Sequence, residues 1–414
     1  MEIIRVSLLK VANQIGNIIT TIVLIAVLSK ETYGLYAVLM SVLLITLNTY
    51  NNGAAIVEAK VTAEQKNYKE KNIRPQIQKA LLLSIPILAF ELALIHTYFP
   101  RSLENIILIM IFSAYFYVEN LKYLISGNLR GQGKNQYGAL LITAPSILLC
   151  GFILLFKTSI TEIHEIFLLR VASSILVIIY TIRTAQLNLD FTTVPPIKQT
   201  FLQFVDGLKV GIAAMSNQLN KNVGILLLGA LMGFAAVTDY KISMLISFPM
   251  TIPAFLMTTV LIRPISRALS DNNTAKYMAK IRKIQYANIL IFLPSVALVL
   301  YFNNLVTYFN YDSKFSVNEY VALTQLTTLF IQNMFGPTNL LIHMQNKSLT
   351  VLKITTLGLT INLIVSYFMI LQIGIIGAVL GSLVSMTFIQ MYGRHINNGL
   401  GVIQNGSVEN LFKR

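Results

Sequence analysis

A lysine and several carboxamides stand in a stretch that is otherwise apolar enough to cross a lipid bilayer. The segment NQLNKNVGILLLGALMG, residues 217–233, places Asn217, Gln218, Asn220 and Lys221 directly before an apolar run. A lysine at the centre of a spanning helix costs about 2.5–3.5 kcal/mol on insertion scales, and such residues usually mark a functional site. We interpret Lys221 as a cation that attracts a negatively charged group. The alternatives are a structural ion pair or a side chain that snorkels to the interface.

Four further ionisable residues inside apolar segments are candidates to carry chemistry. Arg170 lies near one end of its segment, where it either serves a site, snorkels outward or pairs with a nearby glutamate. Glu119 and Lys122 are three residues apart, so on a helix they share a face and either neutralise each other or take part in function. Glu91 has no local partner and is either a protonated core carboxyl or a proton-coupling site.

The composition places these residues in a polytopic membrane protein. The chain has 414 residues, of which 55% are hydrophobic and only 12% charged, and a soluble protein could not bury that much apolar surface. The net charge of +15 reflects cytoplasmic loops rather than a nucleic-acid partner. A single cysteine, Cys150, and the lack of phosphate-loop, Cys-x-x-Cys and His-Glu-x-x-His motifs predict no catalytic residues, cofactor or metal site.

Hydropathy predicts an all-helical fold with twelve spans, because open backbone cannot face lipid. The spans are expected at 7–28, 35–57, 77–99, 104–127, 137–156, 163–186, 208–233, 240–262, 284–302, 319–343, 349–371 and 373–392. With a cytoplasmic N-terminus, 24 of the 32 lysines and arginines fall on the cytoplasmic side and five on the other. This asymmetry predicts that both termini are cytoplasmic.

An internal repeat predicts two lobes of six helices. A shift of 204 residues places Asn13-Gln14 on Asn217-Gln218 and Asn17 on Lys221. We expect an N-lobe at 1–187, a cytoplasmic linker at 188–203 and a C-lobe at 204–414, related by an axis along the membrane normal. Each lobe then opens with a helix that carries a polar stripe, and the two stripes are expected to line a wet cleft. The predicted cleft-lining residues are Asn13, Gln14, Asn17, Asn217, Gln218 and Asn220.

Three segments resemble a known family. LSKETYGLYAVLMSVLLI (28–45) is similar to the connection between the first two helices of polysaccharide transporters, in which a Tyr-Gly-x-Tyr turn follows the first span. The stretch at 204–243 resembles the start of their second half, and IGIIGAVLGSLVS (373–385) resembles their glycine-rich last helix. The chain is identified by this resemblance as a member of the O-antigen flippases (Wzx-type) of the multidrug/oligosaccharidyl-lipid/polysaccharide exporter superfamily.

The resemblance implies a bacterial inner-membrane protein that moves an undecaprenyl-diphosphate-linked glycan from the cytoplasmic to the periplasmic leaflet by alternating access. It implies substrate-binding roles for Lys221, Arg170 and, more weakly, Lys122, and allows ion coupling through Glu91 or Glu119. The implied partners are this glycan, membrane lipids, and a polysaccharide polymerase or chain-length machinery. No nucleic acid and no cofactor are expected.

Other classes of function stay open at the level of sequence. A multidrug or small-cation exporter of the same superfamily would carry acidic residues in its cavity, whereas cations dominate the sites inside spans here. A membrane polysaccharide polymerase, which is an enzyme, would carry charged residues in large outside loops, and the outside loops expected here are short. A structural lipid-binding protein would not require two matching polar stripes.

Overall fold

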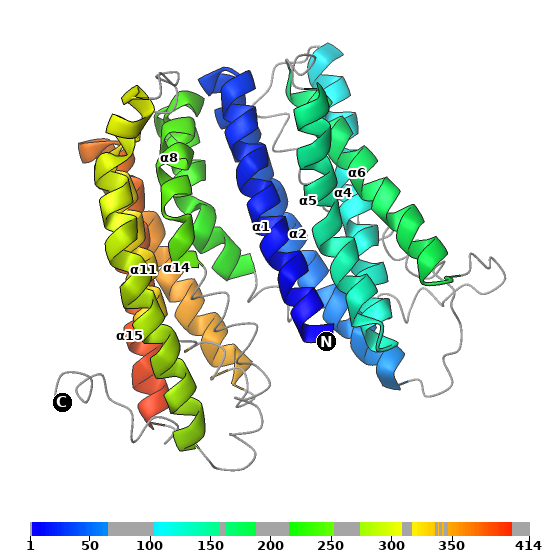
Figure 1. The fold of residues 1–414 in the computed structure, drawn as a ribbon. Coiled ribbons are helices and arrows are strands. Elements are labelled where there is room, and N and C mark those ends of the chain that lie inside the picture. Colours follow the sequence, from blue (N-terminus) through cyan, green and yellow to red (C-terminus); the bar gives the residue numbers. More distant parts are fainter. Residues whose placement is uncertain are drawn as a thin grey trace. The chain divides into compact units, whose positions relative to one another are not determined.

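The computed structural model describes residues 2–64, 103–156, 162–187, 215–251, 274–308, 317–335, 338, 342 and 347–399. Every regular element within these ranges is a helix, as the sequence predicts (Figure 1). The chain forms two compact units, Met1–Met215 and Ser216–Arg414. The predicted third span at 77–99 and the predicted linker at 188–203 lie outside the described residues.

Long apolar helices make the chain a multi-pass membrane protein. Seven of the described helices are long and apolar enough to cross a bilayer. Large hydrophobic side chains on them are exposed, with Leu155 76% and Leu290 73% exposed, as expected where acyl chains replace water around the protein.

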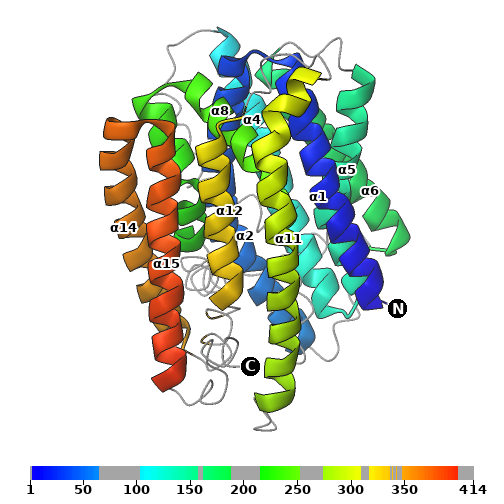
Figure 2. The same ribbon diagram turned by 60° about the vertical axis from the view of Figure 1, so that its left-hand side comes forward.

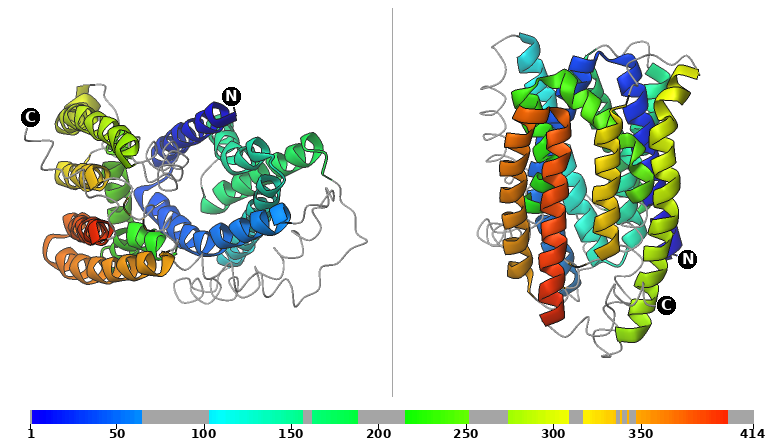
Figure 3. Two further views of the ribbon diagram at one scale, coloured as in Figure 1. Left: turned by 90° about the horizontal axis from the view of Figure 1, so that it is seen from below. Right: turned by 90° about the vertical axis from the view of Figure 1, so that its left-hand side faces the viewer.

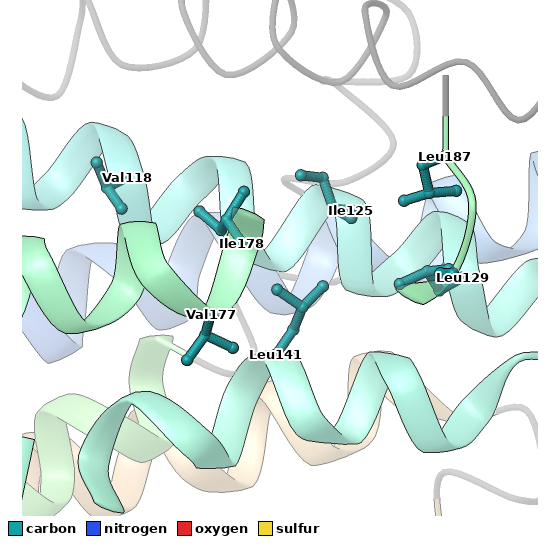
Figure 4. Close-up of a cluster of buried hydrophobic side chains, with 8 residues drawn as sticks. Val118, Ile125, Leu129, Leu141, Val177, Ile178 and Leu187 are labelled. Carbon is teal, nitrogen blue, oxygen red and sulfur yellow. The ribbon is translucent and has the colours of Figure 1, made fainter. Parts of the chain in front are cut away.

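The N-terminal unit contains five described helices. They are α1 (Glu2–Val27), α2 (Lys30–Glu64), α4 (Leu103–Gly131), α5 (Asn135–Phe156) and α6 (Ile163–Thr184). Helix α4 packs against α2, α5 and α6, and α1 packs against α5. The core between α4, α5 and α6 is formed by branched aliphatic residues, among them Ile125, Leu141 and Val177 (Figure 4).

Local sequence signals set the ends of these helices. The hydroxyl of Ser29 accepts a hydrogen bond from the backbone N–H of Thr32 at 3.1 Å, and so caps the start of α2. Glu162 and Glu165 form a reciprocal capping box at the start of α6. Gly133, with φ +78°, makes the turn between α4 and α5 in a conformation that other residues rarely adopt.

The C-terminal unit contains a helix described over 215–231, followed by four further described elements and then a last pair of helices. The first of these are α8 (Phe234–Ile246), the 3-10 turn η1 (Phe248–Met250), α11 (Thr274–Tyr308) and α12 (Glu319–Phe335). The last pair is α14 (Ser348–Ile373) and α15 (Ile375–Gly399). Helix α12 packs against α11 and α15, an arrangement that can be followed in Figure 2.

Helices α14 and α15 form the closest helix pair of this unit, and they run side by side in Figure 3. Gly374, with φ +65°, makes the turn between them. A Cβ atom at Gly377 would collide with the backbone of Met369 and Ile370, and one at Gly381 would collide with Ser366. Glycine at these positions therefore lets the two backbones approach each other.

The described helices differ from the predicted spans where a helix extends beyond its apolar part or where a helix is interrupted. Helix α11 begins at Thr274, ten residues before the predicted 284, because hydropathy detects only the apolar part of a helix. The predicted eighth span, 240–262, begins instead with α8 at Phe234 and is interrupted at Ser247 by η1. Pro249 lies in that 3-10 turn, where its missing N–H is tolerated.

Candidate functional site

Arg170 on α6 is held by two tyrosine hydroxyls from other helices. Its Nε and Nη2 atoms donate to the hydroxyl of Tyr36 on α2, at 3.0 and 2.5 Å, and Nη1 donates to the hydroxyl of Tyr115 on α4 at 3.4 Å. Both tyrosines are 5% exposed, whereas Arg170 is half-buried. Three helices thus converge on one guanidinium group.

Aromatic rings surround this guanidinium. Its carbon lies 5.7 Å from the centre of the Tyr36 ring and 5.9 Å from that of Tyr115, which is within the range of cation–π attraction. Phe167, one turn before Arg170 on α6, contacts the rings of Tyr36, Tyr115 and Phe112. We call Arg170, Tyr36, Tyr115, Phe167 and Phe112 the Arg170 cluster.

The Arg170 cluster carries a positive charge that no carboxylate within the described residues balances. Glu162 and Glu165 are the glutamates nearest to Arg170 in sequence, but Glu162 lies 2.9 Å from His164 and accepts in the capping box of α6. A guanidinium has five N–H donors, and three are directed at tyrosine oxygens. The other two have no acceptor among the described residues, and guanidinium donors of this kind pair well with anions.

Glu119 and Lys122 on α4 form a buried ion pair one turn away from Tyr115. Lys122 Nζ lies 2.5 Å from Glu119 Oε1, and Ser174 Oγ on α6 donates to the same oxygen at 3.0 Å. The side chains of Lys122 and Glu119 are only 5% and 7% exposed. The structure therefore places these two residues in the self-neutralising arrangement that their spacing allows.

Lys221 and its neighbouring carboxamides lie on two different faces of the helix 215–231. Asn217 and Lys221, one turn apart, are exposed, and Gln218 is half-buried. Asn220 is 1% exposed and Gly224 is buried. The polar stripe predicted to run through Asn217 and Asn220 is thus divided between an exposed face and a packed face.

Asn220 belongs to a buried network that joins three helices of the C-terminal unit. Asn362 Nδ2 on α14 donates to the Asn220 backbone oxygen at 2.8 Å and to Asn220 Oδ1 at 2.7 Å. Ser385 Oγ on α15 lies 3.0 Å from the same Oδ1, and Ser366 Oγ donates to Asn362 Oδ1 at 2.8 Å. We call Asn220, Asn362, Ser366 and Ser385 the Asn220 network, and its atoms are used in helix packing.

The remaining predicted site residues do not gather at either place. Asn13 on α1 is half-buried and its Oδ1 atom has no hydrogen-bond partner, whereas Asn17 is exposed. The backbone of Gln14 lies in α1, and its side chain and Glu91 lie outside what the structure describes. Within the described residues, no three histidine, cysteine, aspartate or glutamate side chains come close enough to hold a metal ion.

Sequence reasoning missed Tyr36, Tyr115 and Ser174 as parts of these sites. Tyr36 belongs to the Tyr-Gly-x-Tyr segment that carries the family resemblance, so the segment itself was a signal. Tyr115 and Ser174 lie one turn from Glu119 and Arg170 respectively, and polar residues at this spacing from an intramembrane charge are candidates to solvate it.

The fold that holds these sites is that of an exporter of the multidrug/oligosaccharidyl-lipid/polysaccharide (MOP) superfamily. An outward-facing MATE family multidrug resistance transporter matches with a TM-score of 0.66 at 16% identity, over 97% of this chain and 96% of that chain. The inward-facing conformation of such a transporter gives 0.66 at 14% identity, with the same coverage. A MOP superfamily transporter from Pyrococcus furiosus, described as having a binding pocket of reverse polarity, gives 0.65 at 16%, also over 97% and 96%.

The family follows from the sequence itself. The model of the polysaccharide biosynthesis protein family matches residues 2–269, so the chain belongs to that family. No curated protein sequence matches the chain. The structural neighbours are MOP superfamily transporters, whose fold this chain shares, and the predicted membership of a polysaccharide family is confirmed.

Proposed function

We propose that this protein is a flippase that moves an undecaprenyl-diphosphate-linked oligosaccharide, an O-antigen repeat or a similar unit, from the cytoplasmic to the periplasmic leaflet of a bacterial inner membrane. The lobes would alternate in access to the two sides, with substrate binding favouring one state over the other. The proposal places the glycan and its anionic lipid carrier, rather than a free cation, at the intramembrane sites.

The unbalanced charge of the Arg170 cluster carries this proposal. An arginine whose free donors have no carboxylate partner among the described residues attracts an anion and repels a cation. The two tyrosines that solvate the guanidinium are neutral, so they leave its positive charge unbalanced. Membership of a polysaccharide biosynthesis family points to the same kind of substrate.

Lys221 is the second cation in the proposal. It is exposed on the same face as Asn217, and its compact ammonium group suits a strongly hydrated diphosphate. Asn17, which the predicted repeat aligns with Lys221, is exposed as well. Asn13, Gln14, Asn17, Asn217 and Gln218 are retained as proposed cleft-lining residues. Ion coupling through Glu91 or Glu119, and partnership with a polymerase or chain-length protein, remain proposals.

The alternative is an exporter of drugs or small cations, since the MATE neighbours share the fold. It requires an acidic group free to pair with a cation. Glu119, a buried acid near the middle of α4, is already paired with Lys122 and Ser174. This pairing favours the glycan substrate over a cationic one.

Complementation tests the proposal directly. The gene is expressed in a strain that lacks its repeat-unit flippase and makes the matching glycan, and surface polysaccharide is measured. Wild type is expected to restore it, and Arg170→Ala to fail because the anion loses its partner. Arg183→Ala, which removes an exposed arginine from the same helix, is the matched control.

Two results would overturn the proposal. One is full restoration of surface polysaccharide by Arg170→Ala at normal protein levels. The other is a wild-type protein that raises resistance to cationic drugs but restores no polysaccharide, which would support the alternative.

A further inference from the structure

Two polar layers lie one above the other along the contact between α4 and α6. In the first, Tyr115 of α4 meets Arg170 of α6, and in the second, Glu119 of α4 meets Ser174 of α6. The residues of each helix are four apart, so the layers are separated by one helical turn, about 6 Å. Glu119 on α4 therefore lies one turn from the layer that contains the unbalanced guanidinium of Arg170.

A carboxylate in this position would be expected to pair with Arg170. Arginine and carboxylate groups form strong two-point hydrogen bonds, and a buried carboxylate requires a cationic partner. The structure shows a different arrangement, in which Glu119 Oε1 faces Lys122 Nζ at 2.5 Å and Ser174 Oγ at 3.0 Å. Arg170 instead donates to Tyr36 and Tyr115.

We infer that Lys122 is a positioning residue that, together with Ser174, holds Glu119 away from Arg170 and so keeps the charge of Arg170 available to the substrate. The charge arrangement is inferred from the geometry alone, whereas its consequence for transport rests on the proposed function. It replaces the role of substrate-binding cation first expected for Lys122. The side chain of Lys122 is 5% exposed and its charge is already neutralised.

The inference predicts a specific pattern among variants. Lys122→Met keeps most of the side-chain volume but releases the Glu119 carboxylate, which then pairs with Arg170. Adding Glu119→Gln removes the competing charge and frees Arg170 again. Lys122→Met alone should therefore make Arg170 less available, whereas Lys122→Met with Glu119→Gln should make Arg170 as available as in wild type. If Lys122 itself bound the substrate, removal of the Glu119 carboxylate would not compensate for the loss of Lys122.

Modification of Arg170 by phenylglyoxal, followed by mass spectrometry of the purified full-length protein, measures the pairing without any transport. A carboxylate partner stabilises the charged guanidinium that phenylglyoxal does not attack, so Lys122→Met should slow the modification of Arg170 about tenfold. The double variant should return the rate to that of wild type. Arg183 of the same helix is exposed and provides the internal reference, with an unchanged rate in all variants.

Lys122→Met is then assayed beside Arg170→Ala for surface polysaccharide by complementation, and both are expected to fail. An unchanged Arg170 rate in Lys122→Met, or a double variant as slow as the single one, overturns the inference. If the rates follow the prediction but polysaccharide does not, the charge arrangement is supported and the role of Arg170 in the proposed function fails. If Lys122→Met does not accumulate, Ser174→Ala removes one hydrogen bond from Glu119 and should slow the modification by a smaller factor; no slowing there also overturns the inference.

Discussion

Replacement of Asn362 by leucine should weaken the C-terminal unit by an amount that the Asn220 network sets. Asn362 takes part in three hydrogen bonds, two to Asn220 and one from Ser366, and all three residues are at most 1% exposed. Side-chain hydrogen bonds inside membrane proteins are worth about 0.6 kcal/mol on average. Leucine fills a similar volume, so the expected loss is about 2 kcal/mol, mainly from the three bonds.

Thermal unfolding of the detergent-solubilised protein, followed by circular dichroism, measures this loss. For a unit of this size the midpoint should fall by about 4–8 °C. Thr360→Ala is the control on the same helix, because Thr360 is exposed and its hydroxyl bonds only to the carbonyl of Thr356 within α14. Its midpoint should stay within about 1 °C of wild type, since exposed substitutions rarely exceed 0.5 kcal/mol.

A double variant separates the energy of the hydrogen bonds in the Asn220 network from a general loss of packing. Asn220→Leu and Asn362→Leu remove the two ends of the same bonds, so their combined cost should be smaller than the sum of the single costs. Additive costs, or an Asn362→Leu midpoint equal to that of Thr360→Ala, would refute the reasoning that these bonds hold the three helices together.

Three further predictions concern single contacts. Gly377→Ala should prevent accumulation in the membrane, measured by immunoblot, because its Cβ meets backbone atoms of α14; normal levels would contradict the close approach. Tyr36→Phe should lower polysaccharide restoration and speed up phenylglyoxal modification of Arg170, because two N–H groups of Arg170 lose their acceptor. Unchanged values in both assays would show that Tyr36 does not hold Arg170. Asn333→Leu should lower the unfolding midpoint by an amount equivalent to about 1 kcal/mol, because the Met250 carbonyl loses its 2.8 Å donor and Asn288 Oδ1 its 3.0 Å donor. An unchanged midpoint would show that these two bonds contribute nothing.

Much of the fold was predictable because the bilayer acts on each helix separately. A run of apolar residues must be helical in lipid whatever its neighbours, so hydropathy predicted an all-helical membrane protein and placed most described helices close to their observed bounds. The pairing of Glu119 with Lys122 was also among the predicted alternatives, because residues three apart on a helix face each other without help from the rest of the chain.

Rules based on the spacing of residues along one helix do not predict the contacts between helices. Arg170 was expected to serve a site, to snorkel or to pair with a nearby glutamate. Its partners in the structure are Tyr115, 55 residues earlier in the chain, and Tyr36, 134 residues earlier. Either partner can be found only when α2, α4 and α6 are packed together. Periodicity shows which residues share a helix face, and says nothing of what that face meets.

The sequence by itself determined the class of protein, its helices and the presence of charges that the bilayer penalises, since these depend on composition and local spacing. The tertiary structure alone decided what surrounds a polar group that has no partner on its own helix. Arg170 is solvated by tyrosines from two other helices, and Asn220 is turned into the packing while Lys221, the next residue, is exposed. The physical reason is that adjacent helical residues point about 100° apart, so one can enter a core and the next leave it.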